Sequence, residues 1–140
     1  MEHEESFEEL IRRWKELEDR TSENAEKIIE KTGSKLIKLV FEEIRLDTEK
    51  HKIILERLEE FKDEEIDRED LRCLDSLLAD HERIEMESIE IGNRLLTSLR
   101  TSSVISKIIY HLIDDERKHH GSLKDLLLSI YIPEESFEYV

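Results

Sequence analysis

The sequence predicts an all-α protein folded as an antiparallel, up-down-up-down four-helix bundle. Three observations support this. The 140 residues include only 3 Gly and 1 Pro, and 42% are charged, a composition typical of long amphipathic helices rather than of sheets with many turns. Leu and Ile recur along the chain at the i, i+3, i+4, i+7 spacing of one helix face. Short connections divide the chain into four segments of similar length, as an antiparallel bundle requires.

Helix-ending and helix-starting residues mark the connections. Gly33 has the place of a glycine that follows a helix end, and Ser34 that of the next N-cap. Asp67 caps the third helix after a charged connection, residues 101–103 supply another cap, and Pro133 ends the last helix. The predicted helices span about residues 5–32, 35–62, 68–100 and 103–131, within a bundle of residues 1–132 followed by a tail of residues 133–140.

Each predicted helix carries an apolar stripe. The stripes include Leu10, Ile11, Trp14 and Leu17 in the first helix, Ile37, Ile44, Ile54 and Leu58 in the second, Leu74, Leu78, Ile84 and Leu95 in the third, and Val104, Ile108, Leu112 and Leu123 in the fourth. We expect these four faces to form the core of the bundle, because this spacing places them on one side of each helix.

The fourth helix is apolar over more than one stripe. Ile105, Ile109 and Ile113 flank its core residues and have no expected partner within one bundle. A homodimer is therefore predicted, since two-fold pairing is the commonest way to cover such a surface. The alternative is that the tail folds back, with Phe137 and Tyr139 as the covering residues.

Charge and composition exclude several classes of function. The net charge of −15 argues against binding to nucleic acid or to anionic membranes, because both carry negative charge. No apolar run approaches the roughly 20 residues of a membrane span. The acidic N-terminal segment does not have the pattern of a signal peptide, so a cytoplasmic location is expected. The single Cys73 excludes an internal disulfide and a zinc site built from cysteines.

Side chains able to bind metal interrupt three of the four stripes. They are Asp47 and His51 in the second helix, His81 and Glu85 in the third, and Asp115 and His119 in the fourth. Residues four apart lie one turn apart on the same helix face, and burying a carboxylate needs a compensating partner. A divalent ion would compensate, and oxygen and imidazole ligands suit iron, manganese or zinc. The alternative is a metal-free His–carboxylate network that fixes the helix register.

Two segments carry a resemblance to a known family. Residues 41–51 (FEEIRLDTEKH) and 111–119 (HLIDDERKH) each combine apolar positions, acidic residues and a terminal His. In this the chain resembles the ferritin-like superfamily, particularly its small rubrerythrin-like branch. The resemblance implies Glu-x-x-His on the second and fourth helices and one further Glu on each of the first and third. Glu116 and His119 match this pattern, and Glu85 matches the third-helix carboxylate.

The first half of the chain departs from the family pattern. Thr48 stands where the second helix should carry Glu, and Thr21 where the first should, with Glu18 one turn away as a substitute. His81 has no place in the basic pattern. A single metal, a rearranged site and a lost site all remain open, and the four Cys of a rubredoxin module are absent.

The leading interpretation is a protein that holds iron or manganese, with zinc less favoured, and that has O₂- or peroxide-linked oxidoreductase chemistry. The expected ligands are His51, His81, Glu85, Glu116 and His119, with Asp47 and Asp115 next. The alternative is a non-enzymatic helical bundle that acts as an interaction module with a metal-free polar core. Iron storage is less favoured, because it needs a multi-subunit shell. His3, His111, His120 and Cys73 are assigned no role.

Overall fold

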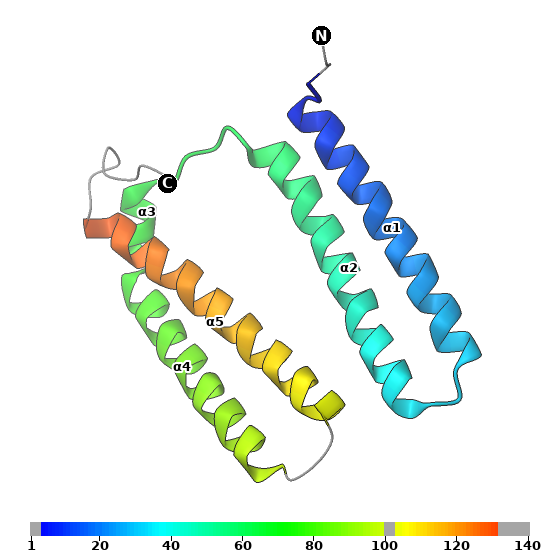
Figure 1. Cartoon of the computed structure of the whole chain (residues 1–140). Coiled ribbons are helices and arrows are strands. Elements are labelled where there is room, and N and C mark those ends of the chain that lie inside the picture. The colour runs from blue at the N-terminus through cyan, green and yellow to red at the C-terminus, as the bar shows by residue number, and fades with distance from the viewer. Residues whose placement is uncertain (1–3, 100–102, 132–140) are drawn as a thin grey trace. The chain divides into compact units, whose positions relative to one another are not determined.

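The computed structural model describes residues 4–99 and 103–131, which form five helices and no strand. In chain order these are α1 (Phe7–Lys31), α2 (Lys35–Phe61), α3 (Arg68–Cys73), α4 (Asp75–Ser98) and α5 (Ser103–Tyr131) (Figure 1). The chain divides into two compact units, Met1–Glu64 and Glu65–Val140, and each is described by itself. The all-helical prediction is confirmed. No helix within the described ranges combines the length and the apolar character that crossing a membrane requires.

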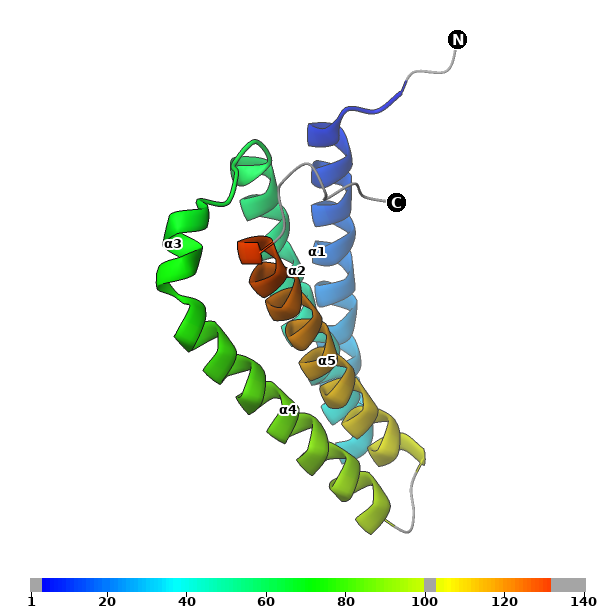
Figure 2. The same cartoon turned by 90° about the vertical axis from the view of Figure 1, so that its left-hand side faces the viewer.

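The N-terminal unit is an antiparallel hairpin in which α1 and α2 lie side by side (Figures 1 and 2). Helix α1 begins after Ser6, whose Oγ accepts a hydrogen bond from the Glu9 amide at 3.1 Å. The predicted cap Ser34 is confirmed, since its Oγ accepts from the Ile37 amide at 3.3 Å. The chain leaves α1 through an extended Thr32, with φ −84° and ψ 141°, and not through a left-handed Gly33.

The core of this hairpin is narrow and lies along the contact between its two helices. Ile11 and Ala25 of α1 are buried, as are Thr48 and Leu55 of α2. Ala25 is only 1% exposed, so its small side chain lies where the helices approach closely. A polar residue, Thr48, is thus part of the core, and its hydroxyl is satisfied by donating to the Arg45 carbonyl at 2.7 Å.

The C-terminal unit differs from the prediction at Leu74, where the expected helix 68–100 is broken into α3 and α4. Leu74 has φ −97° and ψ −1°, and its amide donates to the Leu71 carbonyl at 3.1 Å. Its own carbonyl accepts from the Leu78 amide at 2.8 Å, which starts α4. Asp67 caps α3 as predicted. Helix α3 turns against α5 and buries Leu71.

Helices α4 and α5 also form an antiparallel hairpin (Figures 1 and 2). Ile109 and Ile113 are buried in its core, so the prediction that both lack a partner within the chain is wrong. The reason is that another face of α5 is buried than the one predicted. The side of α5 that meets α4 lies next to the predicted stripe, and Leu112 of that stripe is 55% exposed. Gly92 of α4 permits this packing, since a Cβ there would lie 2.6 Å from Ile113 Cγ1. The predicted tail and the cap at residues 101–102 lie outside the described residues.

Candidate metal centre

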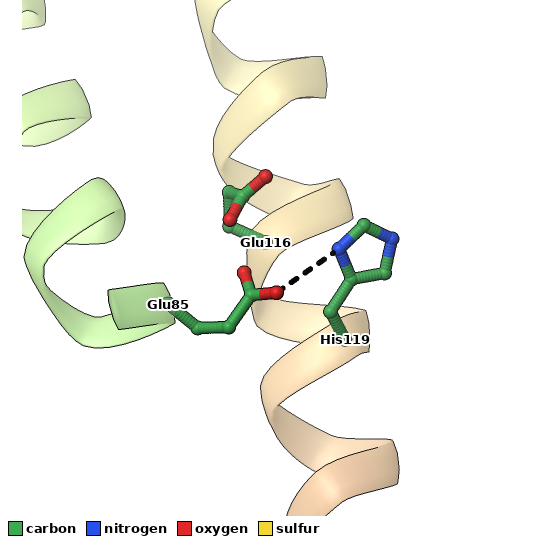
Figure 3. Close-up of side chains that lie close together, drawn as sticks. All are labelled: Glu85, Glu116 and His119. Atoms are coloured by element: carbon green, nitrogen blue, oxygen red, sulfur yellow. Dashed lines mark ion pairs between the residues drawn. The ribbon is translucent and has the colours of Figure 1, made fainter. Parts of the chain in front are cut away.

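Three predicted ligands meet in the C-terminal hairpin. Glu116 and His119 lie three residues apart on α5 and therefore share a helix face. Glu85 reaches them from α4 (Figure 3). One possible ligand atom from each of the three residues lies within 4.8 Å of the other two. The structure therefore brings these three side chains together, and their role as metal ligands stays a prediction.

The two carboxylate oxygens of Glu85 have different surroundings. Oε1 lies 3.2 Å from His81 Nε2 and 3.5 Å from His119 Nδ1. Oε2 is buried and has no hydrogen-bond partner among the described residues. The side chain as a whole is only 7% exposed. A buried carboxylate oxygen without a partner is costly, so this side of Glu85 needs a proton donor or a cation.

Glu116 interacts electrostatically with Glu85. The neighbouring Glu85 carboxyl group, reinforced by burial, raises the pKa of Glu116. Glu116, with smaller contributions from His119 and His81, lowers the pKa of Glu85 against the opposing effect of burial. A proton on Glu116 would relieve the repulsion between two full negative charges at this site. A divalent cation can take the place of that proton.

The other two predicted ligands on these helices lie beside the cluster. His81 contacts Glu85 from one turn earlier on α4, but its ring is 57% exposed and it is not among the three clustered donors. Asp115 is partly exposed, and its charge helps to raise the pKa of Glu116. The cluster that the structure shows is therefore Glu85, Glu116 and His119.

The N-terminal hairpin contains a related set of contacts. His51 Nδ1 lies 3.3 Å from Oε1 of Glu18, which also accepts a hydrogen bond from Trp14 Nε1 at 3.0 Å. Thr48 occupies the position three residues before His51, so no second carboxylate is supplied from there. Asp47 instead pairs with a lysine of its own helix, at 3.7 Å. Glu18 was expected from the sequence to replace the first-helix carboxylate that is missing at Thr21, and it contacts His51.

The sequence predicts that His51 reaches the same point as Glu85 and His119. Because these residues belong to different hairpins, this stays a prediction. Sequence reasoning missed the indole of Trp14 as a polar partner, because the residue also fits the apolar stripe. It likewise missed an ion pair between His120 Nε2 and Glu82 Oε1 at 3.1 Å, across α4 and α5. The sequence contains a signal for this contact, since Glu82 directly follows His81 and His120 directly follows His119.

The donor set fits a divalent first-row metal ion. Two carboxylates and one imidazole offer the mixture of oxygen and nitrogen ligands that iron, manganese and zinc accept. Three protein ligands leave coordination positions for water or a small molecule. A cation would supply a partner for the buried oxygen of Glu85.

Comparison of the chain with protein-family models, with curated proteins and with solved structures finds no match. The ferritin-like resemblance therefore stays a prediction that rests on the two short segments and on the residues that carry it.

Proposed function

We propose that the protein binds one iron or manganese ion at Glu85, Glu116 and His119, within a four-helix bundle of the ferritin-like type. The observation that carries this proposal is the pair of facing carboxyl groups, of which Glu85 has a buried oxygen without a hydrogen-bond partner among the described residues. A divalent ion would neutralise both carboxylates and would supply the partner that this oxygen lacks.

The chain's own groups have separate roles in this proposal. Glu85 and Glu116 supply charge compensation from opposite sides of the hairpin, and His119 supplies a neutral nitrogen ligand when it is deprotonated. When bound, iron or manganese supplies redox chemistry toward O₂ or peroxide. The acidic surface, with a net charge of −15 on the chain, favours the approach of cations.

The four-helix arrangement is part of the proposal and is supported by the apolar surface that each hairpin leaves. Leu10 and Leu17 of α1 are more than 50% exposed within the described chain, and so are Leu77, Ile84 and Ile91 of α4. A two-helix hairpin can cover only one side of each helix, and large apolar faces rarely remain in water. Pairing of the two faces would bury both.

Self-association belongs to the same proposal. Leu39, Leu46 and Ile53 lie seven residues apart on α2 and are at least 45% exposed. This row lies apart from the buried Thr48 and Leu55 and would suit a second copy of the chain. Light scattering in moderate salt, which screens the negative charge, should give the mass of two chains; the mass of one chain at all micromolar concentrations would exclude the dimer.

The alternative is a metal-free helical bundle that serves as an interaction module. The raised pKa of Glu116 supports it, because a proton on that carboxyl group would reduce the negative charge of the pair without an ion. The N-terminal hairpin also supports it, since Thr48 stands where a second ligand would be needed.

The deciding experiment uses the full chain purified without a histidine tag. Elemental analysis should find about one iron or manganese ion per chain. At a free Mn²⁺ concentration of 100 times the Kd, the ion should stabilise the fold by about 2.7 kcal/mol. E116Q should abolish both effects, whereas E18Q, the matched change in the other hairpin, should leave them. Metal-free protein whose melting ignores Mn²⁺ and Fe²⁺ would support the interaction module instead.

A further inference from the structure

His81 and Trp14 occupy equivalent positions in the two hairpins. Each lies four residues before a glutamate on the first long helix of its hairpin, and each directs a ring nitrogen at Oε1 of that glutamate. The distances are 3.2 Å for His81 Nε2 to Glu85 and 3.0 Å for Trp14 Nε1 to Glu18. In both hairpins a His Nδ1 from the second helix lies close to the same oxygen, at 3.5 Å and 3.3 Å.

The indole of Trp14 indicates which role the side chain four residues before the glutamate has in the N-terminal hairpin. Its nitrogen carries a hydrogen and has no lone pair available for a ligand bond, so Trp14 can only donate. An imidazole can either donate through one nitrogen or coordinate a metal through it. The shared geometry therefore favours donation by His81, and its 57% exposed ring, which lies outside the three clustered donors, agrees with that role.

We propose that His81 is a positioning residue and not a metal ligand: its Nε2–H holds Oε1 of Glu85, so that the buried Oε2 is presented to the cation. The expected effect on metal binding rests on the proposed function, although the hydrogen bond between His81 and Glu85 does not itself need the metal. Groups that orient a ligand in this way raise metal affinity by about 10- to 100-fold.

The test compares two replacements at one position, with Mn²⁺ as the probe and calorimetry as the measurement. H81A removes the donor and should weaken Mn²⁺ binding by about 10-fold or more. H81W restores a ring N–H that cannot coordinate, and it should return the affinity to within about 3-fold of the original. Equal losses in H81A and H81W would show that His81 is a ligand, and an unchanged H81A would show that it has no role.

A second measurement keeps the inference separate from the proposed function. In the metal-free protein, NMR relaxation of the Glu85 side-chain methylenes should show an ordered side chain in the original protein and in H81W, and a mobile one in H81A. If the original protein binds no Mn²⁺, the proposed function fails and this measurement alone decides the role of His81. Equal mobility in all three proteins would overturn the inference. H81Q, whose amide also donates, replaces H81W if circular dichroism shows that the tryptophan variant does not fold.

Discussion

The two hairpins surround a glutamate with the same kinds of partner but differ at one neighbouring position. Glu18 and Glu85 each receive a ring nitrogen from their own helix and a His Nδ1 from the next. Three residues before that His, the C-terminal hairpin has Glu116 and the N-terminal hairpin has the buried Thr48. The contacts that hold the first carboxylate are therefore present in both hairpins, whereas the second carboxylate of the proposed metal site is present in one.

The largest expected effect comes from giving the C-terminal hairpin the residue of the N-terminal one. E116T removes one of the two carboxylates, and Mn²⁺ affinity should fall by more than about 100-fold, because losing a ligand exceeds the 10- to 100-fold cost of losing a supporting group. Calorimetric titration measures this, with E18Q as the control. Unchanged affinity would place the ion elsewhere.

The reverse exchange asks whether the N-terminal scaffold is competent. T48E introduces a carboxylate at a position that is 3% exposed, so the metal-free protein should lose at least about 1–3 kcal/mol of stability. Added Mn²⁺ should restore it and raise the number of bound ions per chain. Thermal melting with and without Mn²⁺ reports both. T48V, which removes the hydroxyl without adding charge, controls for disturbed packing and should show no response to metal.

Packing at the closest approach of the helices gives a smaller difference. G92A gains about 1 kcal/mol from helix propensity, but its Cβ would meet Ile113 Cγ1 at 2.6 Å. Overpacking costs about 1–3 kcal/mol, so we expect a net loss of up to about 2 kcal/mol in urea unfolding.

The matched control for G92A is G121A. Gly121 also lies within a helix, but nothing lies within 4 Å of the added Cβ. It should gain up to about 1 kcal/mol. Equal effects at both positions would show that the α4–α5 contact is looser than described.

The smallest effect concerns an exposed pair that links the ends of α1 and α2. The hydrogen bond from Lys62 lowers the pKa of Glu8 below its ordinary value of 4.5. Its small contribution to stability is therefore present above that pH and is lost as the pH falls through the lower folded-state pKa. Urea unfolding should show a slightly weaker loss on acidification in K62M than in the original protein. Parallel pH curves for the two proteins would assign the pair no role.

The starts of α2 and α3 were predictable because capping residues act locally. Ser34 and Asp67 cap as the sequence suggested. The break at Leu74 was not predictable, because no Gly or Pro accompanies it; it occurs where α3 packs against α5, a contact between segments distant in the sequence. The face of α5 that meets α4 was also missed. Ile109 and Leu112 are both apolar, and only the partner helix decides which one is buried.

For the site, the residues of the cluster could be chosen as candidates because Glu116 and His119 form a local motif and Glu85 interrupts a stripe at the same depth. The role that we propose for His81 could not be deduced in this way. Its spacing to Glu85 is the same for a metal ligand and for a hydrogen-bond donor, and only the tryptophan at the equivalent position separates the two.

The break at Leu74 also has a consequence for local unfolding. Helix α3 has only six residues, and Leu71 is its one buried side chain among those described. Because Leu74 interrupts the helical hydrogen bonds between α3 and α4, α3 can open without disturbing the turn that carries Glu85. Its amides should therefore exchange with solvent deuterium well before those around Glu85, in a sub-global opening. The cluster of Glu85, Glu116 and His119 would then lie in the slowly exchanging part of the C-terminal hairpin, and α3 would be a separately opening segment beside it.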